Sequence, residues 1–114
     1  MSSPFAALLP QPPPIDRLAP DLRETVARYR VELDEGSSVD VVLDHGRLSV
    51  EEASGTADCV MKCSGDQLGR LLHGEVNLMT AFLRGDIQLQ KGSLELGKRL
   101  YRFLRSAREE GARS

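Results

Sequence analysis

The strongest constraint on the fold of this chain is a change in the spacing of its apolar residues near residue 64. Between residues 25 and 63, apolar and polar residues alternate with a period of two, as in strands that bury one face. After residue 64, leucines recur at intervals of three and four residues, which is typical of helices. The order predicts an α+β domain with a five-stranded, mainly antiparallel sheet covered by helices on one face.

Five segments carry the strand pattern. They are residues 25–34, 39–44, 48–50, 57–63 and 86–90. Turn residues separate the first four, among them the tight turn Asp44–Gly46. We expect these four strands to form an antiparallel meander. The fifth strand then returns to the sheet after two short helices.

Polar residues mark the starts of the predicted helices. Ser64 and Gln67 form a capping-box pair ahead of a leucine helix that ends near Gly74. Asn77 can cap a second short helix, residues 78–83, which Gly85 ends. Ser93 can cap the last helix. A short helical turn is also expected at residues 20–24 because proline suits the first helical position.

The last helix is strongly amphipathic. Its apolar residues fill almost half of the circumference, whereas docking on a sheet needs a stripe only about 100° wide. The surplus apolar surface could face a cavity or a second chain. Its other half carries the basic stripe of Lys98, Arg99, Arg102 and Arg105. This stripe is either a solvated helix face or a surface that contacts the anionic headgroups of a membrane.

Length and charge narrow the function classes. The 114 residues suffice for one domain, and a net charge of −2 without tryptophan gives no reason to expect a nucleic-acid partner. We predict a proline-rich arm over residues 1–22, a domain over residues 23–108 and a disordered tail over residues 109–114. The opening segment lacks a basic leader, and apolar runs are too short to span a bilayer, so a cytoplasmic location is expected.

Catalytic chemistry is not predicted. Cys59 and Cys63 point to the same face of one strand, roughly 13 Å apart, which is too far for a disulfide. We interpret both as buried apolar residues. His45 in a turn and His73 at a helix end are isolated, and the sequence contains no nucleophile motif, phosphate-binding loop or metal-ligand spacing. We therefore expect no enzyme activity, metal or cofactor.

The order of these elements resembles the type-two sterol carrier protein domain. Residues matching that family's pattern, in order and spacing, are Ala57–Cys59, Gly74–Asn77, Ala81–Phe82, Gly85–Leu89 and Gly92 with Leu96–Leu100. The resemblance covers roughly residues 25–104. Two positions depart from it: Leu78 replaces a proline that usually follows the asparagine, and the proline-rich start leaves little room for the family's long first helix.

The resemblance implies a non-catalytic carrier with an apolar cavity between sheet and helices for a sterol, a fatty acyl chain or an isoprenoid chain. The residues predicted to bind the lipid are Met61, Leu68, Leu72, Phe82, Leu83, Leu96, Leu100 and Leu104. Plain core packing is the competing interpretation of these residues. The alternative function is a protein-interaction or homodimerisation module without a ligand, for example an accessory domain in lipid-quinone synthesis or of a larger enzyme.

Overall fold

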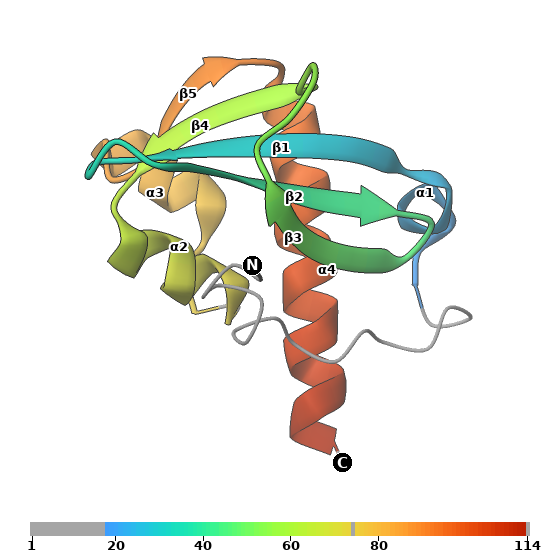
Figure 1. The fold of residues 1–114 in the computed structure, drawn as a ribbon. Coiled ribbons are helices and arrows are strands. Elements are labelled where there is room, and N and C mark those ends of the chain that lie inside the picture. The colour runs from blue at the N-terminus through green and yellow to red at the C-terminus, as the bar shows by residue number, and fades with distance from the viewer. Residues whose placement is uncertain (1–17, 74, 114) are drawn as a thin grey trace.

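The computed structural model describes residues 18–73 and 75–113 (Figure 1). Within these ranges, the helices are α1 (Pro20–Glu24), α2 (Gly65–Leu72), α3 (Leu78–Arg84) and α4 (Leu94–Arg113). The strands are β1 (Val26–Leu33), β2 (Ser38–Asp44), β3 (Arg47–Glu52), β4 (Cys59–Cys63) and β5 (Gln88–Lys91). The predicted α+β class and the five strands are confirmed. Most of the predicted proline-rich arm, residues 1–17, lies outside the described residues.

The five strands form one mixed sheet in the order β3-β2-β1-β4-β5. Three of the four pairings are antiparallel, but β4 runs parallel to β1. The expectation that the first four strands form a meander was therefore wrong for β4. The start of β4 is held beside β1 because Asp58 and Arg28 exchange two hydrogen bonds, of 2.8 and 2.9 Å, through their backbones and the Asp58 carboxylate. Alternation fixes which face is buried, not which strand is the neighbour.

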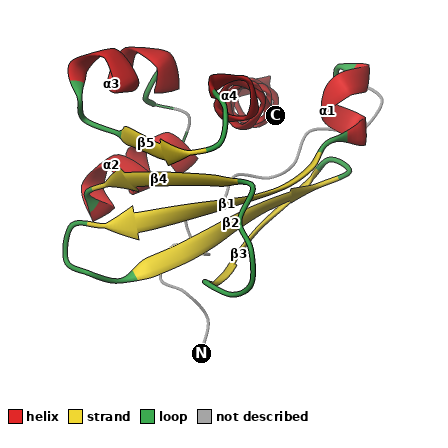
Figure 2. Cartoon of the chain, turned by 90° about the horizontal axis from the view of Figure 1, so that it is seen from above, coloured by secondary structure: helices red, strands yellow, loops and turns green. Residues whose placement is uncertain are grey.

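One face of the sheet is apolar and carries the helices. Tyr29, Val41, Leu43 and Met61 lie on this face and are at most 1% exposed. Figure 2 shows α1, α3 and α4 on the same side of the sheet. Leucines of α2 and α4 complete a single buried apolar cluster with these strands, which we call the helix–sheet core. The prediction of helices on one face is confirmed.

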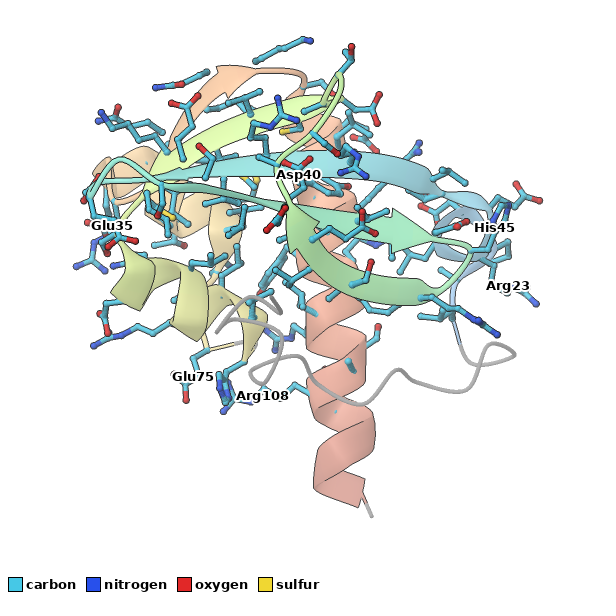
Figure 3. All side chains as sticks on the ribbon, in the orientation of Figure 1. Arg23, Glu35, Asp40, His45, Glu75 and Arg108 are labelled. Atoms are coloured by element: carbon cyan, nitrogen blue, oxygen red, sulfur yellow. The ribbon has the colours of Figure 1, made fainter. Side chains whose placement is uncertain are left out.

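The opposite face carries a buried charge, Asp40 (Figure 3). Its carboxylate accepts hydrogen bonds from Arg28 Nη1 at 2.6 Å, Arg30 Nε at 2.9 Å and the Ser54 N–H at 3.1 Å. Arg30 also donates to the carbonyls of Ser54 and Gly55. This network therefore ties β1 and β2 to the connection that leads from β3 to β4.

The helix ends follow the predicted capping chemistry. Ser64 Oγ accepts a hydrogen bond from the Gln67 N–H at 3.1 Å, and Asn77 Oδ1 accepts from the N–H groups of Met79 and Thr80. Gly85 ends α3 with φ of 79°, a left-handed conformation that costs a glycine little. These short helices therefore begin and end where their cap residues stand.

The last helix is longer than the sequence pattern indicated. α4 continues to Arg113, through most of the segment predicted as a disordered tail over residues 109–114. An ion pair between Arg105 and Glu109, one helical turn apart, supports this extension. Ala107 is still 1% exposed, and the helix continues beyond it.

Candidate functional site

Most of the predicted lipid-binding residues lie together in the helix–sheet core. Five of them are at most 1% exposed: Met61, Leu68, Leu72, Leu100 and Leu104. Met61 comes from β4, whereas the leucines come from α2 and α4. Their side chains meet because the buried face of the sheet and the inner faces of both helices are apolar. The structure thus brings residues from distant parts of the sequence into one apolar volume.

Phe82 and Leu96 lie at the edge of this core, half-buried. The α3 and α4 helices approach closely here at Gly97, where an added Cβ would lie 3.3 Å from Leu78 Cδ2 and 3.4 Å from Phe82 Cε2. Leu83 is different, since 89% of the residue is exposed. A lipid enclosed by the core would not reach Leu83, so its role in binding stays a prediction for the outer surface of α3.

The hydroxyl of Tyr29 lies at the edge of the apolar volume. The Tyr29 hydroxyl donates a hydrogen bond of 2.7 Å to the carbonyl of Leu96. Burial is the main cause that raises the pKa of Tyr29 well above its usual value. The hydroxyl therefore stays neutral and joins β1 to the start of α4 without bringing a charge into the core.

The other titratable candidates show no catalytic arrangement. Cys59 and Cys63 are free and buried, and burial together with a neighbouring carboxylate raises the pKa of each thiol to about 11. Both remain protonated and poorly nucleophilic at neutral pH. His45 stands in the turn after β2 with φ of 49°, while His73 ends α2. Over the described part of the chain, no group of three or more metal-ligating side chains gathers, and no helix has the length and apolarity to cross a bilayer.

The basic stripe on α4 is partly neutralised. Arg102 forms two hydrogen bonds to the Asp21 carboxylate of α1, at 2.6 and 3.1 Å. Arg105 donates to the Tyr101 hydroxyl at 2.9 Å and lies 3.5 Å from Glu109. Lys98 is exposed, and Arg99 is half-buried. Half of the stripe thus serves contacts within the domain.

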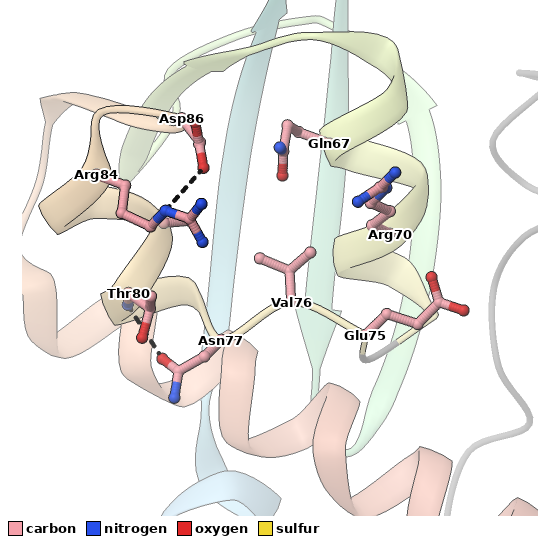
Figure 4. A pocket seen from close by; sticks show the side chains of 9 residues that line it. Gln67, Arg70, Glu75, Val76, Asn77, Thr80, Arg84 and Asp86 are labelled. Carbon is pink, nitrogen blue, oxygen red and sulfur yellow. Dashed lines mark hydrogen bonds and ion pairs between the residues drawn. The ribbon is translucent and has the colours of Figure 1, made fainter.

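A polar groove runs between α2 and α3 (Figure 4). It has a volume of about 260 Å³ and is lined by Gln67, Arg70, Glu75, Val76, Asn77, Thr80, Ala81, Arg84 and Asp86. No sequence pattern had indicated this groove. Arg70 and Arg84 lie on two separate short helices, α2 and α3. Their spacing in the sequence matches no known motif, so the sequence did not predict that they line one groove.

The comparisons with known proteins identify the family of this chain. The model of the SCP-2 sterol transfer family matches residues 5–105. The chain belongs to the SCP-2 sterol transfer family. This confirms the resemblance inferred from the sequence motifs, and the match begins earlier than the roughly 25–104 expected from them. No curated protein sequence matches the chain.

Solved structures with the same fold share little sequence with the chain. A ubiquinone synthesis protein, UbiJ-SCP2, is 22% identical over 78% of both chains, with a TM-score of 0.58. Sterol carrier protein 2 from Yarrowia lipolytica in its apo form is 19% identical, covering 73% of this chain and 68% of that one, with a TM-score of 0.52. The sec-alkylsulfatase Pisa1 from Pseudomonas sp. is 19% identical, with a TM-score of 0.62; the match covers 84% of this chain and 15% of the sulfatase. The fold of this chain thus makes up most of two small proteins and a small part of a larger one.

Proposed function

We propose that this SCP-2 domain binds the apolar body of a lipid between its sheet and its helices and catalyses no reaction on it. The observation that carries the proposal is the helix–sheet core itself, in a chain that belongs to a sterol transfer family. A sterol, a fatty acyl chain or an isoprenoid chain would suit such a site. Affinity would come from apolar burial, at about 25 cal/mol per Å², with little demand for polar contacts.

Entry of a lipid requires the core to open. Its side chains exclude water almost completely, so a ligand must displace packed residues or separate two helices. The contact between α3 and α4 is the natural place. Phe82 and Leu96 are the half-buried members of the site there, and Gly97 offers no side chain that would lock the two helices together. We therefore assign Phe82 and Leu96 to the entrance and Met61, Leu72, Leu100 and Leu104 to the walls.

The first test is to identify what the protein carries. Native mass spectrometry of the purified chain, followed by organic extraction, is expected to show an adduct of lipid mass. A bare homodimer would instead favour the alternative function, a dimerisation or interaction module without a ligand. The UbiJ-SCP2 likeness makes an accessory role in quinone synthesis one form of that alternative. A cytoplasmic location and transient contact with acidic membranes also belong to the carrier proposal.

A matched pair of variants tests the entrance. Phe82→Asp places a carboxylate at the edge of the core and is expected to lower uptake of a fluorescent sterol about tenfold. Val26→Asp places the same charge on a residue that is 61% exposed and lies outside the core, so uptake should persist. Substitution of fully buried Leu100 would be uninformative because a buried carboxylate unfolds the domain. Equal uptake by both variants would contradict the assigned entrance.

A further inference from the structure

The groove between α2 and α3 presents two cationic groups to the same open space. Figure 4 shows the guanidinium groups of Arg70, from α2, and Arg84, from α3, projecting from opposite walls. The Gln67 amide lies between them, above the side chain of Val76. Glu75 also lines the groove, and its carboxylate is turned away from the Gln67 side chain. The groove therefore gathers hydrogen-bond donors over an apolar floor.

Both guanidinium groups keep most of their donors for a ligand. Arg70 Nε lies 3.2 Å from the carboxylate of Asp66, one turn away on the exposed side of α2. Arg84 Nε lies 3.9 Å from the carboxylate of Asp86, beyond hydrogen-bond distance. Within the described residues these are their ion pairs, and exposed pairs of this kind contribute little. A planar guanidinium with free N–H groups matches the geometry of a carboxylate or a phosphate.

The floor of the groove connects it with the helix–sheet core. Ala81 lines the groove, is only 3% exposed and belongs to the core cluster. Val76, also in the groove, packs against the same cluster. A ligand held by its anionic end at the arginines would thus have its other end above apolar residues that lead inward between α2 and α3.

We propose that Arg70 and Arg84 bind the anionic head of a single-chain lipid, a carboxylate or a phosphate, whose chain enters the helix–sheet core between α2 and α3. This inference rests on the proposed lipid-binding function. It adds a head-group preference and, for single-chain acidic lipids, a second way into the core between α2 and α3, besides the entrance assigned to Phe82 and Leu96 between α3 and α4. Asp86 limits the preference because its carboxylate lies in the same groove and repels an anion. Neutral lipids of equal chain length would then bind more weakly than acidic ones.

Calorimetric titration of the delipidated full chain tests the head-group preference. The probes are dodecanoate, dodecyl phosphate and dodecanol, with acetate and inorganic phosphate as anions without a chain. We expect both acidic amphiphiles to bind about tenfold or more tightly than dodecanol. Arg70→Gln with Arg84→Gln should remove this advantage and leave dodecanol binding unchanged. The control, Arg23→Gln with Arg47→Gln, changes the net charge equally at arginines outside the groove and should keep the advantage.

Asp86→Asn supplies an independent readout, since removal of a like charge should strengthen dodecanoate binding several-fold and leave dodecanol unaffected. Equal affinity for dodecanoate and dodecanol in the unmodified chain would overturn the head-group site while supporting the lipid-binding function. Undiminished affinity for dodecanoate in the Arg70→Gln, Arg84→Gln variant would also overturn the head-group site while supporting the lipid-binding function. Binding of acetate or phosphate as tight as that of dodecanoate would overturn the lipid assignment of the groove. Absence of binding by all three amphiphiles would overturn both proposals.

Discussion

Asp40 holds a full charge at a position where the sheet should face water. Its carboxylate is 0% exposed, because residues 53–58 cross over it and Arg28 and Arg30 reach it from β1. Burial on its own would raise the pKa of Asp40. Hydrogen bonds from Arg30, the Ser54 N–H and Arg28 outweigh this effect, so the net result is a pKa below the usual value. The folded state therefore favours the ionised form.

Replacement of Asp40 by Asn should lower the free energy of unfolding by about 1–3 kcal/mol at pH 7, because Arg28 and Arg30 lose the negative charge and one of the two acceptor oxygens that they share. The pKa is lower in the folded chain than in the unfolded chain. The stabilisation that the Asp40 carboxylate gives the folded state is therefore present above about pH 4. It is lost as the pH falls through the pKa of Asp40 in the folded chain. Denaturant titrations of both proteins between pH 7 and pH 2.5 would measure this. A difference between them that stays constant over that range would contradict the assignment.

At Gly92 the backbone lies so close to the backbone of Asp58 that there is room only for glycine. It has φ of 93°, and an added Cβ would lie 2.7 Å from the Asp58 carbonyl oxygen. We expect Gly92→Ala to destabilise the domain by about 1–2 kcal/mol through backbone strain and by about 1–3 kcal/mol more through this clash. Gly36 has a similar φ of 104° with open space around it, so Gly36→Ala should show only the strain. Equal losses of stability for both variants in urea unfolding would refute the clash.

At the scale of single elements, the cap residues determine where the short helices begin and end. α3 has only seven residues, and isolated helices of that length are unstable in water. Asn77 Oδ1 accepts hydrogen bonds of 3.0 and 3.2 Å from its first N–H groups. Asn77→Ala should therefore cost about 1 kcal/mol of stability. Asn77→Asp keeps the acceptor and should stay near the unmodified value; similar losses for both variants in urea unfolding would exclude a capping role.

The same elements show what the sequence could and could not predict. Alternation and cap residues are local signals, so the strands, the starts of α2 and α3, and the buried faces of Cys59 and Cys63 were predicted correctly. Strand pairing is not local. The parallel partner of β4 depends on Asp58 reaching Arg28, thirty residues earlier in the chain. The groove likewise depends on how two short helices lie beside each other, which neither helix encodes alone.

At the scale of the molecule, the proposed lipid site coincides with the packed core, so lipid binding would require the core to open. The apolar residues that hold the helices to the sheet are the residues proposed to surround the lipid. This double role explains why pattern alone could not separate core packing from a binding cavity. An opened core exposes apolar surface to water, and a bound lipid would cover it again. Ligand binding and stability of the fold should therefore be coupled.

A lipid that binds only the folded chain should stabilise it by mass action. At a free concentration of 100 times Kd, the free energy of unfolding rises by about 2.7 kcal/mol, which corresponds to a rise in Tm of about 10 °C or more for a domain of this size. Differential scanning calorimetry of the delipidated chain with increasing dodecanol, which tests burial of the chain without a head-group charge, measures the effect. A dimerisation module without a ligand would respond differently. Its Tm would rise with protein concentration and would not change with lipid concentration. One experiment thus separates the two functions: the Tm of a lipid carrier depends on lipid concentration, and the Tm of a dimerisation module depends on protein concentration. In both cases the stability depends on the partner that covers the same apolar residues.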